Sequence, residues 1–209
     1  MFACSQLGAY FTLFNYAYSS TELVNALTAT TPKILLTSLG TSRYDYSAVL
    51  ASLRDAAIPK KIIILNDLSN PSVSKTVVHP FVRYEDVISR RGWSSEDMLA
   101  LENGVLPSDI LNLQFTSGST GLPKAAALTH HGMVNSARYI GDEMNVTEKD
   151  RINVPVPLFH AFGLIMGECL DVTSLILTHY RRSLQRSSPR RIHRPSLGVL
   201  RRICNTSCC

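Results

Sequence analysis

The chain has 209 residues, 45% of them hydrophobic, which is enough for one large or two small domains with a buried core. Of its 21 Lys and Arg residues, 13 precede position 179 together with all 16 acids, so the net charge of +5 divides into −3 for this body and +8 for residues 179–209. No run approaches the roughly 18 consecutive apolar residues of a transmembrane helix, so we expect no membrane span.

The cysteines indicate no disulfide framework and no metal site. Cys4 and Cys169 lie in apolar surroundings and are expected to be ordinary core thiols. Cys204, Cys208 and Cys209 lack the spacing of metal ligands.

The N-terminal part predicts a helix followed by alternating strands and helices. Ser19 and Glu22 form a capping box, which predicts a helix that begins near Ser20. The continuous apolar runs in residues 33–38 and 60–66 predict buried strands.

The segment between those two strands, residues 46–57, carries Val49, Leu50 and Leu53 on one helical face. Strand, helix and strand in this order imply a parallel α/β sheet. Residues 67–107 contain three prolines and mixed charge, so we expect a connecting segment with one or two short helices, in which Trp93 packs a loop onto the sheet.

Residues 110–116 alternate apolar and polar side chains, which predicts a half-buried strand. The apolar positions are Leu111, Leu113 and Phe115, and the polar positions are Asn112 and Gln114.

The strand leads into a loop that combines glycines, hydroxyl groups and one lysine. Gly118 and Gly121 let the backbone bring N–H groups together, and Lys124 supplies a compact cation. The hydroxyl groups belong to Thr116, Ser117, Ser119 and Thr120. These donors suit the oxygens of a polyphosphate, so the segment predicts a phosphate-holding loop.

A helix is expected after the loop. The small residues 125–127 lead towards it, and Thr129 is a suitable N-cap. Met133, Ala137 and Ile140 fall at helical spacing and predict its apolar face.

Two other interpretations of the loop compete with this one. A Walker A loop requires a different glycine–lysine spacing, and Ala125 occupies the place of its magnesium-binding hydroxyl, so that motif is rejected. A cluster of Ser, Thr and Gly is also typical of a plain surface loop.

The longer sequence FTSGSTGLPKAAALTHHGMVN, residues 115–135, resembles the signature loop of the adenylate-forming superfamily. That superfamily includes acyl-CoA synthetases, aryl-CoA ligases, luciferases and peptide-synthetase adenylation domains. Ser119 replaces the commoner Thr and Ala125 the commoner Gly, both conservatively. The AAALTHH run is most similar to the fatty and medium-chain acyl-CoA synthetase branch.

A second segment, RINVPVPLFHAFGLIMG at residues 151–167, resembles the family block in which a strand ends in Pro-Leu-aromatic-His. A single His among Phe, Leu and Ile is otherwise typical of a buried core histidine. The resemblance instead implies that His160 lines the passage between the nucleotide phosphates and the acyl pocket.

The resemblance implies an α/β fold: a partial N-terminal domain of an adenylate-forming enzyme, with a mostly parallel sheet flanked by helices. It implies ATP-dependent activation of a carboxylic acid, most similar to the fatty acid branch, to an acyl-adenylate and then an acyl-CoA thioester. ATP, Mg²⁺ and coenzyme A are the implied small molecules. The loop residues Thr116, Ser117, Gly118, Ser119, Thr120, Gly121 and Lys124 would hold the β and γ phosphates.

The resemblance is weaker in residues 6–38, where Asn15, Glu22 and Leu23 match, and it fades after about Asp171. The family's Tyr-Gly-x-Thr-Glu and Thr-Gly-Asp blocks, its hinge and its small C-terminal domain are missing. We therefore expect a partial adenylation domain at residues 1–178 and a disordered Arg/Ser-rich tail at residues 179–209.

The tail contains eight arginines and no acidic residue. Such a tail can bind nucleic acid or anionic lipid through its charge, or it can be a frameshifted or unspliced ending that replaces the family sequence.

Three hypotheses follow for the chain. It is an acyl-CoA ligase-like protein that is incomplete for catalysis, an inactive remnant, or a basic-tailed binding protein on an adenylation scaffold. We expect a cytoplasmic location and no specific nucleic-acid partner, and the acyl substrate and the oligomeric state stay open.

Overall fold

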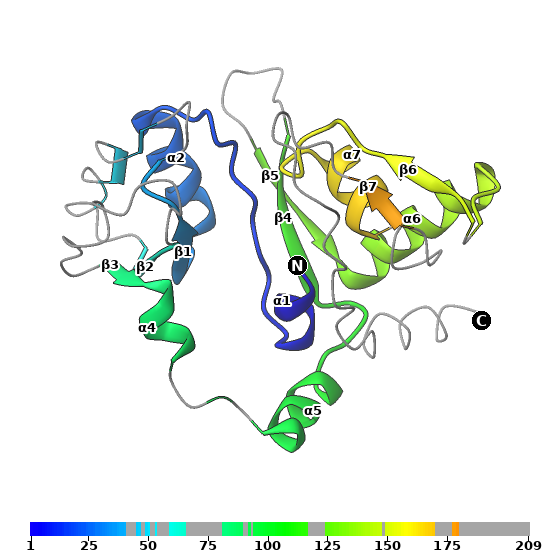
Figure 1. Cartoon of the computed structure of the whole chain (residues 1–209), viewed down its shortest axis with the longest axis horizontal. Helices are drawn as coiled ribbons and strands as arrows, with labels where there is room; N and C mark the ends of the chain where they lie inside the picture. Colours follow the sequence, from blue (N-terminus) through cyan, green and yellow to red (C-terminus); the bar gives the residue numbers. More distant parts are fainter. Residues whose placement is uncertain are drawn as a thin grey trace. The chain divides into compact units, whose positions relative to one another are not determined.

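The computed structural model describes residues 1–40, 45–46, 49–50, 53, 59–65, 81–89, 92, 94–116, 124–147, 149–169 and 177–179. The chain divides into two compact units (Figure 1). The small unit is Phe14–Trp93, and the large unit combines Met1–Leu13 with Ser94–Cys209. The expected domain of residues 1–178 therefore contains two units, while residues 180–209 of the expected tail lie outside the described part of the chain.

The small unit contains a parallel three-stranded sheet in the order β1-β2-β3. Strand β1 is Ile34–Thr37, β2 is Lys61–Ile64 and β3 is Phe81–Arg83. In the register, Leu35 lies beside Ile62, and Ile63 lies beside Val82. The expected parallel sheet is confirmed.

Helix α2, Ser20–Thr30, begins where the capping box predicts. The Ser19 hydroxyl accepts a hydrogen bond from the Glu22 backbone N–H at 3.3 Å, and Glu22 Oε2 accepts one from the Ser19 backbone N–H at 2.8 Å. The hydrogen bonds from Ser19 also lower the pKa of Glu22. Local capping thus fixes the start of this helix.

The core of the small unit lies between α2 and one face of the sheet. Its buried residues are Leu27, Leu35, Leu50, Leu53, Ile62 and Ile64. The expected helix at residues 46–57 is described only in part, with residues 49–50 helical. The side chains of Leu50 and Leu53 are nevertheless buried in the core, as the helical spacing of apolar residues in this segment predicts.

The burial of the two predicted strands differs. In β2, Ile62, Ile63 and Ile64 are all buried, which confirms the expectation. In β1, only Leu35 is buried, while Ile34 and Leu36 are each 54% exposed, so the expectation of a fully buried strand was wrong there. Because alternate side chains of a strand point to opposite faces, and β1 lies at the end of the described sheet, only its Leu35 face packs against the core.

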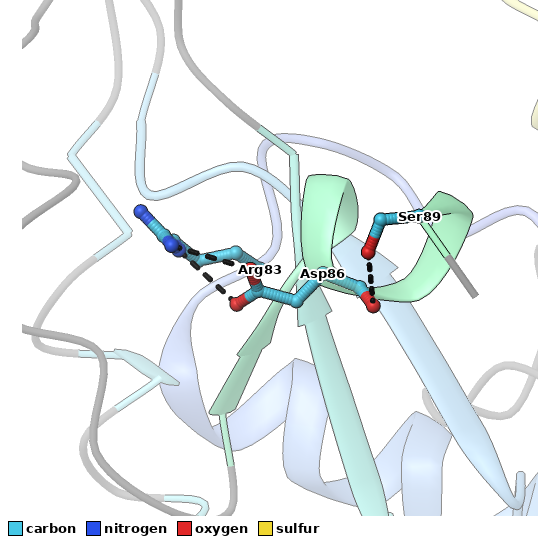
Figure 2. A network of polar contacts seen from close by, with 3 residues as sticks. All are labelled: Arg83, Asp86 and Ser89. Atoms are coloured by element: carbon cyan, nitrogen blue, oxygen red, sulfur yellow. Dashed lines mark hydrogen bonds and ion pairs between the residues drawn. The ribbon is translucent and has the colours of Figure 1, made fainter.

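The connecting segment carries two short helices, as expected. Helix α4, Tyr84–Ile88, follows β3 directly in the small unit, and helix α5, Ser95–Asn103, belongs to the large unit. Figure 2 shows that the Arg83 guanidinium donates two hydrogen bonds to the Asp86 carboxylate, each at 3.2 Å, at the start of α4. The Ser89 hydroxyl donates to the Asp86 carbonyl at 3.2 Å, whereas Trp93 lies outside the described residues.

The large unit is built on a hairpin and a helix. Strand β4, Ile110–Thr116, has the bounds that the alternation predicts, and it pairs antiparallel with β5, Lys124–Thr129. Helix α6, His130–Glu143, follows β5 without a break. Along the chain, the other elements of the unit are α1, Phe2–Gln6; β6, Arg151–Asn153; α7, Ala161–Gly163; the π-helix η2, Leu164–Cys169; and β7, Leu177–His179.

Strand β5 was not anticipated, because residues 125–127 are three alanines, which favour helix. The pairing with β4 outweighs that preference: Ala125 lies beside Phe115, and Ala127 beside Leu113. Strands β6 and β7 pair in parallel, so three of the four described strand pairings are parallel and the α/β class is confirmed.

The core of the large unit packs β4 against α6 and η2. Its buried residues are Leu111, Met133, Ala137, Val154, Leu164, Ile165, Met166 and Cys169. Burial raises the pKa of the Cys169 thiol to about 12, which agrees with a core thiol, and Cys4 is half-buried. None of the helices in the described part of the chain is long and apolar enough to span a membrane.

Adjacent residues of β4 give a direct test of this packing. Leu111 is 1% exposed in the core, whereas Ile110 is 42% exposed. Leu111→Ala should lower the free energy of unfolding by about 2–5 kcal/mol, because it leaves a cavity. Ile110→Ala, the matched control, should cost about 1 kcal/mol or less. Urea denaturation followed by circular dichroism measures both, and equal losses would contradict the packing of β4.

Candidate functional site

The hairpin brings the two ends of the expected phosphate loop together. Thr116 ends β4 and Lys124 begins β5, and the two are cross-strand partners. The Thr116 hydroxyl donates a hydrogen bond to the Lys124 carbonyl at 3.3 Å, and both side chains are exposed. The other expected loop residues, Ser117, Gly118, Ser119, Thr120 and Gly121, lie outside the described residues.

Helix α6 follows the hairpin with the predicted N-cap. The Thr129 hydroxyl accepts a hydrogen bond from the Gly132 backbone N–H at 3.0 Å. Met133 and Ala137 are buried and Ile140 packs against the same core, so the predicted apolar face is confirmed. Strand β5 therefore leads directly into a helix that is capped at its N-terminus and packed against the core.

The first residue of α6, His130, is fully buried at 0% exposure. Its Nδ1 lies 3.5 Å from the Ser5 hydroxyl of α1, and its Nε2 has no hydrogen-bond partner among the described residues. Burial lowers the pKa of His130, against a smaller opposing effect of the Asp109 carboxylate. The imidazole is therefore held neutral at the N-terminus of α6, where the helix dipole also disfavours a cation.

The polar side of β4 is buried, which corrects the expectation of a half-buried strand. Asn112 is 1% exposed and Gln114 is 5% exposed. The Asn112 amide donates to the Phe11 carbonyl at 3.0 Å, and the Gln114 amide donates to the Phe159 carbonyl at 2.6 Å. The amide N–H groups find backbone acceptors, which offsets part of the cost of burial, whereas Asn112 Oδ1 has no hydrogen-bond partner among the described residues.

The second motif forms a tight turn that leads into α7. The His160 N–H donates to the Pro157 carbonyl at 3.1 Å, and the His160 carbonyl accepts from the Leu164 N–H at 3.0 Å. The imidazole is exposed, and its ring centre lies 4.5 Å from that of Phe159, with 45° between the planes. The alternative of a core histidine is thus excluded for His160.

Close packing of backbone holds this turn against α7. A Cβ atom added to Gly163 would lie 2.4 Å from the Pro157 carbonyl oxygen and 2.8 Å from the Val156 carbonyl oxygen. The helix then widens into the π-helix η2, a geometry that often occurs near functional sites. Only glycine at position 163 allows the Val156–Pro157 backbone to approach so closely.

The Gln114 side chain forms a hydrogen bond from β4 to the second motif. This side chain lies two residues before Thr116, and its partner carbonyl lies one residue before His160. The alternation of residues 110–116 marks Gln114 only as a polar position of a strand. Its long carboxamide, directly ahead of the expected loop, is the one available signal for the contact with Phe159.

Comparisons with known proteins agree with this geometry. The family model for AMP-binding enzymes matches residues 1–188. The acyl-CoA ligase sidI of Beauveria bassiana is 37% identical over 173 residues, which cover 82% of this chain and 28% of the relative. The acyl-CoA ligase SID4 of Ajellomyces capsulatus is 38% identical over 178 residues, covering 82% of this chain and 29% of the relative.

Solved structures show the same fold. A red-emitting luciferase from Phrixothrix hirtus superposes with a TM-score of 0.63 at 17% identity, covering 88% of this chain and 34% of its own. ATP-bound MatB from Rhodopseudomonas palustris gives a TM-score of 0.54 at 19% identity, covering 84% of this chain and 31% of its own.

The fold and the two motifs thus define part of an adenylate-forming enzyme, and the chain belongs to the AMP-binding enzyme family. It is similar to acyl-CoA ligases, and it spans 28–29% of the length of the two ligase relatives described above.

The packing at Gly163 can be tested by substitution. Gly163→Ala should lower the free energy of unfolding by about 1–3 kcal/mol, because the clash with two backbone carbonyls exceeds the gain in helix propensity of up to about 1 kcal/mol. Gly104→Ala is the control, since its Cβ would meet only the Leu101 carbonyl oxygen at an ordinary 3.4 Å. Urea denaturation compares the two, and a neutral Gly163→Ala would show that the turn is not packed in this way.

Burial of His130 predicts a pH dependence of stability. The folded-state pKa lies below the ordinary 6.5, so the unfolded chain takes up a proton first as the pH falls, and stability is lost below that pH. His130→Gln should remove this component of the decline between about pH 7.5 and about pH 5.5, and His131→Gln, at an exposed neighbour, should retain it.

The measurement is the free energy of unfolding at each pH. The carboxylates with lowered pKa values, Glu22, Asp97 and Asp150, start from ordinary values of 4.5, 3.8 and 3.8 and titrate below this window. If His130→Gln shows the same slope as the unchanged chain, the buried neutral imidazole is refuted.

Proposed function

We propose that this chain carries the pyrophosphate-holding part of an acyl-CoA ligase. The full reaction would use ATP to activate a carboxylic acid, in keeping with the fatty acid branch, and would then transfer the acyl group to the thiol of coenzyme A. The observation that carries the proposal is the hairpin, which closes the hydroxyl- and glycine-rich loop by pairing Thr116 with Lys124. The two acyl-CoA ligase relatives, which match over 82% of the chain, support it.

The donors in this segment fit a chain of phosphates. The Lys124 side chain is exposed at the mouth of the hairpin, where an ammonium can meet phosphate oxygens. Thr116 lies across from it, and residues 117–121 add three hydroxyl groups and two glycines. In the proposed role, these groups stabilise the charge that develops on the leaving pyrophosphate.

Magnesium would enter with the phosphates. Within the described residues, no group of three His, Cys, Asp or Glu side chains is placed to hold a metal ion. In this proposal, phosphate oxygens and loop hydroxyls would hold Mg²⁺, since these are the hard oxygen ligands that it prefers.

His160 would act on the acyl side of the site. Its exposed ring, held against Phe159, is available to a substrate rather than packed in the core. We assign it the role of lining the passage from the phosphates to the acid.

Binding of magnesium pyrophosphate tests the proposal directly. Lys124→Ala should weaken binding by about tenfold or more, because it removes a charge-assisted hydrogen bond. Lys149→Ala is the matched control, since Lys149 is an exposed lysine of the same unit. Isothermal titration calorimetry measures both.

The same samples give a second readout. Because the chain spans less than a third of its ligase relatives, we expect carboxylate-dependent exchange between pyrophosphate and ATP to stay at background. Pyrophosphate binding that is equal in the unchanged chain and Lys124→Ala would refute the loop assignment. Exchange above background that depends on Lys124 would show instead that the chain is a complete catalyst.

A further inference from the structure

Strand β4 carries two carboxamides on one buried face. Asn112 and Gln114 are two residues apart, 1% and 5% exposed, and each donates to a backbone carbonyl of a distant segment. Buried amides require such partners, so both hydrogen bonds stabilise the fold. The two side chains differ in their hydrogen-bond acceptors: Asn112 donates to the Phe11 carbonyl, whereas Gln114 donates to the Phe159 carbonyl.

The Gln114 side-chain amide donates two hydrogen bonds. Its Nε2 donates to the Phe159 carbonyl at 2.6 Å and to the Phe115 carbonyl of its own strand at 3.3 Å. The first distance is at the short end for an N–H···O hydrogen bond. The amide group therefore clamps the turn before His160 to the strand just before Thr116.

This clamp is a side-chain hydrogen bond that joins β4 to the second motif. The Phe159 carbonyl lies next to the Phe159–His160 peptide bond, so fixing it also fixes the direction in which the His160 backbone leaves the turn. The His160 ring packs against the Phe159 ring, with 4.5 Å between the ring centres. The Gln114 side chain on β4 thus influences the orientation of the His160 ring through two contacts: its hydrogen bond to the Phe159 carbonyl, and the contact between the Phe159 and His160 rings.

We propose that Gln114 is a positioning residue of the adenylation site, whose amide sets where the His160 ring lies relative to Thr116 and Lys124. This inference rests on the proposed function. It deepens that function by coupling the phosphate side of the site to the acyl side. A purely structural amide would stabilise the strand without affecting His160.

Asn112 provides the matched control for that alternative. It has the same chemistry, lies on the same face of β4 and has similar burial, but it contacts no residue of the second motif in the described hydrogen bonds. Gln114→Leu and Asn112→Leu should both reduce stability, because each removes a buried hydrogen bond to a backbone carbonyl. The Phe11 carbonyl keeps the hydrogen bond that it also accepts from the Leu113 N–H at 3.0 Å. Only Gln114→Leu should change the position of the His160 ring.

The first experiment uses the full chain without ligand. Histidine ring carbons and nitrogens are labelled, the His160 signals are assigned by their loss in His160→Gln, and nuclear magnetic resonance spectra are compared among variants. Gln114→Leu should move the His160 ring signals towards those of an unstructured histidine, while Asn112→Leu should leave them in place. Unchanged His160 signals in Gln114→Leu overturn the proposal.

Gln114→Asn keeps the test valid if Gln114→Leu does not fold. It preserves a buried carboxamide but is shorter by one methylene, about 1.5 Å, which is too far for the 2.6 Å hydrogen bond to persist. The same displacement of the His160 signals is expected. If the signals match those of the unchanged chain, the proposal is overturned as before.

The second experiment adds magnesium pyrophosphate. In the unchanged chain its binding should shift the His160 signals, and in Gln114→Leu that response should fall by about fivefold or more while Lys124-dependent binding persists. Binding with an undiminished His160 response would overturn the coupling and leave the proposed function intact. Failure of the unchanged chain to bind pyrophosphate would overturn the proposed function and, with it, the role of Gln114 in the site.

Discussion

Strand β4 is fixed on both faces, and the geometry of the large unit depends on this double constraint. On one face, Leu111 lies in the hydrophobic core with Met133 of α6 and Leu164 of η2. On the other face, Asn112 and Gln114 make buried hydrogen bonds to backbone carbonyls. A one-residue slip of the strand would exchange the two faces and bury amides in the apolar core, so the register is strongly specified.

The register of β4 in turn determines where the loop begins. With Leu111 and Gln114 fixed, Thr116 must end the strand opposite Lys124. Helix α6 starts directly after β5, capped by Thr129 and seated by the buried His130. Thr116 and Lys124, the ends of the proposed phosphate loop, therefore each lie in a paired strand, an arrangement that suits the proposed phosphate binding.

The features that the sequence predicted well are those with local physical causes. The capping box of Ser19 and Glu22 spans four residues, and the cap of Thr129 acts within the first turn of α6. The bounds of β4 follow from an alternation within seven residues. In each case the interacting groups are close in sequence, so their pattern is visible before the fold is known.

The features that the sequence did not predict depend on distant partners. Gln114 and Phe159 are 45 residues apart, and Asn112 and Phe11 are 101 apart, so nothing local shows that these amides are buried. The alanines of β5 favour helix until β4 pairs with them, and the exposure of Ile34 and Leu36 depends on which face of the sheet is covered. Tertiary context overrides local preference at each of these positions.

The same distinction between local and long-range contacts applies to the two parts of the candidate site, the segment 116–124 and His160. Residues 116–124 form one continuous segment, and its two ends, Thr116 and Lys124, are cross-strand partners in β4 and β5. The Phe159–His160 turn, in contrast, is tied to β4 by a hydrogen bond between residues far apart in the sequence, from Gln114 to the Phe159 carbonyl. In the proposed site, phosphate binding would therefore depend on the local pairing of Thr116 with Lys124, whereas the proposed coupling to His160 would depend on the buried amide of Gln114.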